Sequence, residues 1–74
     1  MNITDVLKDA AARKVSDIFI IAGRPLGFKI NNRIENYSEE VLMPKETETL
    51  ISGIYQIAQQ RDMTSILKLS LIHI

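Results

Sequence analysis

Apolar residues near the start of the chain recur at helical spacing. They follow one another at intervals of three and four residues and line one face of a helix: Ile3, Val6, Leu7, Ala10 and Ala11. Asn2 is suited to cap this helix, and Asp5 lies in its first turn, where the helix dipole favours a carboxylate. We therefore expect a first helix that ends near Lys14.

A short run of β-branched and aromatic residues follows, without a helical period. It extends from Asp17 to Ala22, and the turn-forming sequence Gly23-Arg24-Pro25 closes it. Because almost every side chain in the run is apolar, we expect a strand that is buried on both faces. Gly23 is interpreted as a turn glycine rather than a phosphate contact.

Two further extended stretches, residues 26–30 and 33–37, flank Asn31 and Asn32. Paired asparagines tolerate positive φ and suit a two-residue hairpin turn. Apolar residues alternate with charged ones along both stretches, which predicts a hairpin with one apolar and one solvated face. The residues expected on the apolar face are Phe28, Ile30 and Ile34.

A second helix is expected from Pro44, which suits a first helical position, to about Gln60. Glu46 and Glu48 lie in its first turn, and Gly53 costs about 1 kcal/mol relative to alanine. The apolar stripe of this helix is continuous: Thr47, Leu50, Ile51, Ile54, Ile57 and Ala58. A further helical turn is expected around Met63, Ile66 and Leu67.

The order helix, strand, hairpin, helix predicts an α+β layer in which two helices cover one face of a three-stranded sheet. After residue 68 the chain continues as Leu-Ser-Leu-Ile-His-Ile, without a cap, a turn or a charged tail. Exposed apolar ends promote aggregation, so such a run is unusual at the end of a domain. We therefore expect a truncated chain.

Composition narrows the class of protein. Hydrophobic residues make up 46% and charged residues 24%, as in globular proteins, and the longest apolar run, residues 18–22, is too short to cross a bilayer. The nine basic and nine acidic residues balance, so the chain has no excess positive charge that would attract nucleic acid. Cysteine is absent, which excludes disulfides and thiolate metal sites and fits a reducing cytoplasm.

Complete catalytic motifs are missing from the sequence. It has neither a P-loop nor a dinucleotide-binding glycine pattern, and its one histidine, His73, lies in the unusual final run. Glu39 and Glu40 are adjacent, so their side chains point apart and do not form a carboxylate pair.

Two polar groups have a structural and a functional interpretation. Ser16 and Asp17 follow the first helix at a corner, where short polar side chains satisfy free backbone groups. Around the hairpin, Lys29, Arg33 and Arg24 are expected near one another. These cations either form a solvated face or contact an acidic partner surface.

The run from Ser16 to Ile34 reads SDIFIIAGRPLGFKINNRI and resembles the first conserved block of the PilT-type secretion and twitching-motility ATPases. That block typically reads Ser-Asp-Leu-His-Leu, then Gly-x-Pro, then Arg-Val-Asp-Gly-Asp-Leu. The stretch from residue 42 to residue 54 resembles the next segment of that family, where Thr-Pro opens a helix. The residues that depart from the family pattern are Phe19, Lys29, Asn32 and Met43, which replace histidine, arginine, glycine and threonine.

The resemblance covers about residues 3–67. It implies an incomplete PAS-like N-terminal domain of a cytoplasmic, hexameric pilus-retraction or secretion ATPase. In this family the N-terminal domain packs on the ATPase domain of its own chain and of the neighbouring subunit, and the machine attaches to the pilus platform of the inner membrane. ATP and Mg bind in the C-terminal domain, so catalytic, cofactor and metal residues are not expected in this chain. The motif residues carried over have packing roles: Ser16, Asp17, Gly23, Pro25, Lys29 and Pro44.

The last six residues resemble the translation of a transposon-end adapter used in sequencing libraries. On this interpretation residues 1–68 are a truncated N-terminal α/β domain and residues 69–74 are a non-native tail. The alternative hypothesis is a stand-alone, small PAS-like sensor or adaptor that binds a protein or a ligand. The sequence does not distinguish pilus retraction from assembly or secretion.

Overall fold

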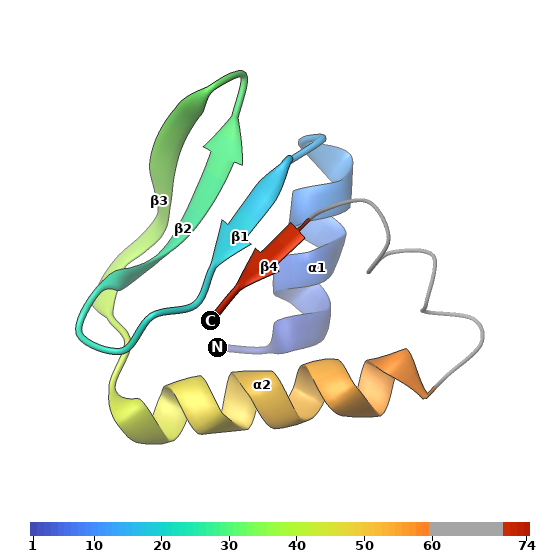
Figure 1. The fold of residues 1–74 in the computed structure, drawn as a ribbon, viewed down its shortest axis with the longest axis vertical. Coiled ribbons are helices and arrows are strands. Elements are labelled where there is room, and N and C mark those ends of the chain that lie inside the picture. The colour runs from blue at the N-terminus through green and yellow to red at the C-terminus, as the bar shows by residue number, and fades with distance from the viewer. Residues whose placement is uncertain (60–70) are drawn as a thin grey trace.

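The computed structural model describes residues 1–59 and 71–74. Its helices and strands follow in the order α1 (Ile3–Ala12), β1 (Asp17–Phe19), β2 (Pro25–Ile30), β3 (Arg33–Val41), α2 (Pro44–Ala58) and β4 (Leu71–His73) (Figure 1). The strands form one mixed sheet in the order β3-β2-β1-β4, in which only the β1–β4 pair is parallel. The α+β class is confirmed, and the sheet has one strand more than the sequence predicted.

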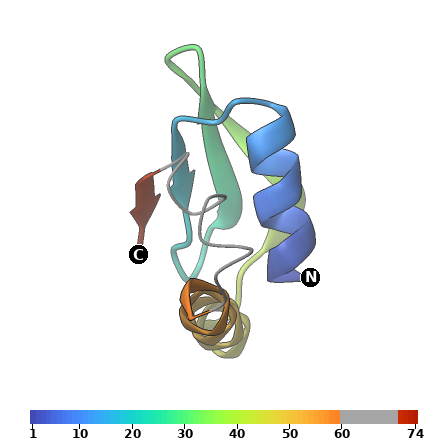
Figure 2. The same ribbon diagram turned by 90° about the vertical axis from the view of Figure 1, so that its right-hand side faces the viewer.

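Helix α1 forms as its pattern predicts. The Asn2 side chain caps it by accepting a hydrogen bond from the Thr4 backbone N–H at 2.8 Å. The helix ends at Ala12, and Lys14 takes a left-handed conformation with φ of 56°. One face of α1 packs on the sheet, where its buried residues are Val6, Leu7 and Ala10 (Figure 2).

Helix α2 begins at Pro44, as predicted, but it does not lie beside α1 on the face of the sheet. It crosses one end of the sheet (Figures 1 and 2). The two helices meet where Gly53 lies against Ile3, because a Cβ atom at Gly53 would come within 2.5 Å of Ile3 Cγ2. The glycine that weakens α2 as an isolated helix therefore permits its close contact with α1.

The strand expected from Asp17 to Ala22 is shorter and is buried on one face only. β1 ends at Phe19. Ile18 and Ile20 are in the core, 1% and 0% exposed, whereas Ile21 is 39% exposed. Successive side chains point to opposite faces of a sheet, and α1 covers only one of them. An apolar sequence run alone does not show whether a second layer of structure exists.

The hairpin turn was predicted correctly, but one face assignment was wrong. Asn31 and Asn32 have φ of 50° and 65°, which a two-residue turn requires. This turn pairs Lys29 with Ile34 and Phe28 with Glu35. Ile34 therefore lies on the face opposite Phe28 and is 67% exposed.

The fourth strand, β4, lies in residues 69–74, which were expected to be a non-native tail. Leu71 pairs with Asp17, and His73 pairs with Phe19. Ile72 packs against the core. The predicted helical turn around residues 63–67 lies outside the described residues. Neither described helix combines the length and the apolar character that a membrane span requires.

Candidate functional site

One face of the sheet has no described helix over it and carries exposed apolar side chains. α1 packs on the other face, so the uncovered face looks toward the viewer in Figure 1. Several large hydrophobic side chains on this side are solvent-exposed: Ile21 at 39%, Ile34 at 67% and Leu71 at 68%. Large exposed apolar side chains that share one face are typical of interaction sites. We refer to these residues together with Phe19 as the uncovered face.

A depression of about 320 Å³ lies within the uncovered face. Gly27 forms part of its floor, because a Cβ atom there would lie 3.7 Å from the Phe19 ring. Arg24 contributes the cationic group of the lining, and no ion pair to it is found within the described residues. The complete lining is Phe19, Ile21, Arg24, Pro25, Gly27, Ile34 and Asn36. Such a site can bind an apolar side chain beside an anionic group, but it contains no acid–base pair for catalysis.

Ser16, Asp17 and Lys29 meet at one corner of the sheet, where β1 begins. The Ser16 backbone N–H donates to the Lys29 carbonyl oxygen at 2.9 Å, and the Ser16 hydroxyl lies 2.7 Å from Asp17 Oδ2. Asp17 pairs with Lys29 across β1 and β2. Ser16 thus satisfies backbone and side-chain groups at the corner, as the structural interpretation of this dipeptide requires.

His73 joins this corner from β4. Its Nε2 lies 2.8 Å from Asp17 Oδ1, and because an ionised carboxylate only accepts hydrogen bonds, Nε2 carries the proton. Hydrogen bonds from His73 and then from Ser16 hold the pKa of Asp17 below its ordinary value, and the positive charge of Lys29 acts in the same direction. The imidazole also stacks on Phe19, with ring centroids 4.6 Å apart and an interplanar angle of 14°.

Sequence reasoning missed the group formed by Asp17, Phe19 and His73. His73 is far from the other two residues in the sequence, and a three-residue apolar strand carries no periodic signal that would indicate its partner. An expected site residue, Asp17, and a departure from the family pattern, Phe19, were identified, but not as neighbours of a histidine.

The remaining motif residues lie at the opposite end of the sheet. Gly23 has φ of 85°, and its N–H donates to the Leu42 carbonyl oxygen at 2.8 Å. Pro25 opens β2 and pairs with Val41, which is three residues before Pro44. The motif residues therefore form two groups, one at each end of the sheet, and do not form a single site.

The cations around the hairpin do not form the single patch that the sequence predicted. Arg24 lies at the end of β2 opposite the turn. Lys29 pairs with Ile34, and Arg33 pairs with Ile30, so Lys29 and Arg33 point to opposite faces. The prediction failed because positions close in sequence alternate between faces.

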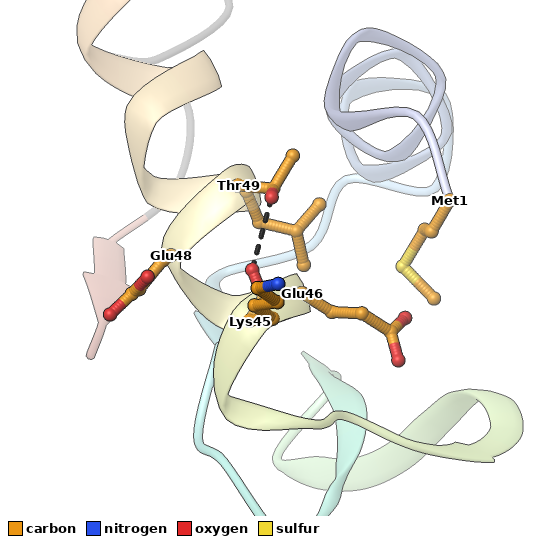
Figure 3. A pocket seen from close by; sticks show the side chains of 6 residues that line it. Met1, Lys45, Glu46, Glu48 and Thr49 are labelled. Atoms are coloured by element: carbon orange, nitrogen blue, oxygen red, sulfur yellow. Dashed lines mark hydrogen bonds between the residues drawn. The ribbon is translucent and has the colours of Figure 1, made fainter.

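A larger hollow, of about 420 Å³, lies between the N-terminus and the first turns of α2 (Figure 3). Its lining consists of Met1, Lys45, Glu46, Glu48, Thr49 and Leu50. The Thr49 hydroxyl donates to the Lys45 carbonyl oxygen at 3.0 Å, so this hydroxyl is engaged within the helix. Side chains of mixed charge on an exposed helix form a solvated surface, and no group of three metal-binding side chains occurs in residues 1–59 and 71–74.

The comparisons with known proteins gave no match: no family model, no curated protein and no solved structure matches this chain. The fold and the site define a small α+β chain with one sheet face that carries exposed apolar side chains and that the described residues leave uncovered.

Proposed function

We propose that this chain is the N-terminal packing and oligomerisation domain, in truncated form, of a PilT-like hexameric ATPase that retracts pili or drives secretion. The resemblance of the run from Ser16 to Ile34 to the first conserved block of that family supports the proposal. The observation that carries its packing role is the uncovered face, on which Ile34 is 67% and Ile21 39% exposed. Large exposed apolar side chains on one sheet face suit a surface that another domain covers.

In this proposal the chain performs no chemistry of its own. The uncovered face packs against the ATPase domain of the same polypeptide or of the neighbouring subunit, and the domain transmits motion between subunits. ATP and Mg bind in the C-terminal domain of the parent protein. The assembled hexamer is cytoplasmic and acts at the inner-membrane platform of the pilus machine.

The uninterrupted genomic reading frame tests this function. We expect the frame to depart from the present sequence after Lys68 and to encode Gly-x-x-x-x-Gly-Lys-Ser/Thr within about 200 codons, the span of a typical domain. A genomic copy that continues through Leu-Ser-Leu-Ile-His-Ile to a stop codon, without that motif, would refute the proposal.

A second candidate function is a stand-alone, PAS-like sensor or adaptor. The observation that favours it is β4, because Leu71–His73 has a hydrogen-bonded place in the sheet and Ile72 packs against the core. On this hypothesis the purified chain unfolds cooperatively as a monomer, and the gene has a natural stop codon after residue 74. Thermal melting followed by circular dichroism, combined with sedimentation velocity, measures the first property.

A further inference from the structure

The outer edge of β1 binds an extended segment through backbone hydrogen bonds. The Ile20 N–H donates to the His73 carbonyl oxygen at 2.8 Å, and the Leu71 N–H donates to the Ser16 carbonyl oxygen at 3.0 Å. The segment runs parallel to β1, with Ile72 opposite Ile18. This edge therefore presents both a donor and an acceptor to a strand that lies beside it.

The side-chain environment differs at each position of the bound segment. At the middle position Ile72 packs against the core. At the first position Leu71 is 68% exposed, so this position imposes little selection. At the third position His73 stacks on Phe19 and reaches the Asp17 carboxylate. The edge thus selects a large apolar residue followed by a flat side chain that carries a hydrogen-bond donor.

The segment that occupies this edge is weakly held compared with the rest of the sheet. β4 has three residues, as β1 does, but β1 lies between two strands whereas β4 lies at the edge of the sheet with β1 as its one partner strand among the described residues. It places one side chain against the core, and the His73 side chain is 45% exposed. Short edge elements with few buried contacts open at low free-energy cost. Exchange of β4 for another segment therefore leaves the β1–β3 meander intact.

We infer that the outer edge of β1 is a docking site for an extended segment of a partner polypeptide, bound parallel to β1, with the pattern of a large apolar residue followed by histidine or arginine. Main-chain hydrogen bonds supply affinity in this mode of recognition, and side-chain environments supply specificity. Arginine suits the third position because its planar cation stacks on an aromatic ring and donates to a carboxylate. The inference concerns β1 alone and does not depend on the proposed function.

The test uses the full chain with the substitution Ile72→Asp, which places a carboxylate against the core and releases β4. A six-residue peptide with the sequence of residues 69–74 is titrated into this ¹⁵N-labelled variant. We expect saturable shifts of the Ile18 and Ile20 amide signals. Binding to the unsubstituted chain should be at least about tenfold weaker, because its own β4 competes as an intramolecular ligand at high effective concentration.

Peptide variants test the side-chain pattern. Leu71→Ala in the peptide is the matched control and should leave affinity within about twofold, whereas Ile72→Asp should abolish binding. His73→Ala should weaken binding several-fold, and His73→Arg should bind at least as tightly as the parent peptide. Absence of shifts at β1, or equal affinity of the Leu71→Ala and Ile72→Asp peptides, would overturn the inference.

Amide hydrogen exchange gives an independent measurement on the unsubstituted chain. The Ile20 amide should be protected, and His73→Ala should reduce its protection while that of Phe28 in β2 stays within about twofold. An unprotected Ile20 amide would contradict the docking geometry. If Ile72→Asp unfolds the chain, the peptide titration is made with His73→Ala, for which the same outcomes apply.

Discussion

Tyr37 connects β3 to α1 through its hydroxyl group. The hydroxyl donates to Asp9 Oδ2 at 2.5 Å, and the ring lies against Phe28 with centroids 4.9 Å apart. Tyr37 lies on the same face of β3 as Glu35, the face that α1 covers. This hydrogen bond ties an edge strand with little buried surface to the helix.

Replacement of Tyr37 by phenylalanine should reduce the free energy of unfolding by about 1.5 kcal/mol, the lower end of the net value of a hydrogen bond to a charged group. Tyr55, which is 67% exposed, provides the matched control. Tyr55→Phe should change stability by less than about 0.5 kcal/mol. Urea unfolding followed by circular dichroism measures both, and equal effects of the two substitutions would contradict the role of the Tyr37 hydroxyl.

The same group makes stability depend on alkaline pH. The hydrogen bond to Asp9 and then burial raise the pKa of Tyr37 above its ordinary value. The unfolded state therefore releases this proton first as pH rises, so the contribution of Tyr37 is complete below about pH 10 and is lost as pH rises through the folded-state pKa. Unfolding measured from pH 8 to pH 11 should show this loss in the unsubstituted chain. A loss of equal size in Tyr37→Phe would contradict the assignment.

Among the elements, the two helices depend on one close contact. Gly53 in α2 lies where a Cβ atom would be 2.5 Å from Ile3 Cγ2, closer than packed carbon atoms approach. That methyl group is on a β-branched side chain, which has few alternative rotamers in a helix. The angle between α2 and α1 is therefore set by the absence of a side chain at position 53.

Gly53→Ala should destabilise the chain by about 1 kcal/mol or more, because overpacking outweighs the gain in helix propensity. In an Ile3→Ala background the same change should instead stabilise the chain by up to about 1 kcal/mol. A double-mutant cycle from denaturant unfolding measures this coupling. Stabilisation by Gly53→Ala in the unsubstituted chain would show that the helices do not meet at this position.

At the scale of the whole molecule, the described helices leave one face of the sheet uncovered. Ile34 and Leu71 are thereby left on the outside of a chain that has a complete core on the other face. Exposed apolar surface of this kind marks an interaction site or a site of aggregation. Substitutions on the uncovered face should therefore change self-association more than substitutions elsewhere on the surface.

Ile34→Lys should reduce concentration-dependent self-association and leave stability within about 0.5 kcal/mol, since Ile34 is already 67% exposed. Tyr55→Lys is the matched control, because Tyr55 is equally exposed, on α2, and acquires the same charge. Sedimentation velocity over a range of concentrations compares the two variants. An equal decrease with Tyr55→Lys would indicate a general charge effect and would contradict a role for the uncovered face.

The sequence by itself determined the local elements of this protein. Asn2 caps α1, Asn31 and Asn32 form the hairpin turn, and Pro44 begins α2, as their positions predicted. Each of these features depends on backbone conformation and on neighbours within a few residues, so the local sequence is enough to predict it. The motif residues Ser16, Asp17 and Lys29 were selected by the family resemblance, and their common corner became visible only in the structure.

Only the tertiary structure decided which faces are covered and which distant residues meet. The face on which Ile34 lies depends on which residues the hairpin turn pairs, and the partial burial of β1 depends on which face of the sheet α1 covers. The contact of His73 with Asp17 and Phe19 depends on the register of β4 against β1. These features arise from contacts between segments that are far apart in the chain. The free energies of such contacts cannot be predicted from a local pattern of residues.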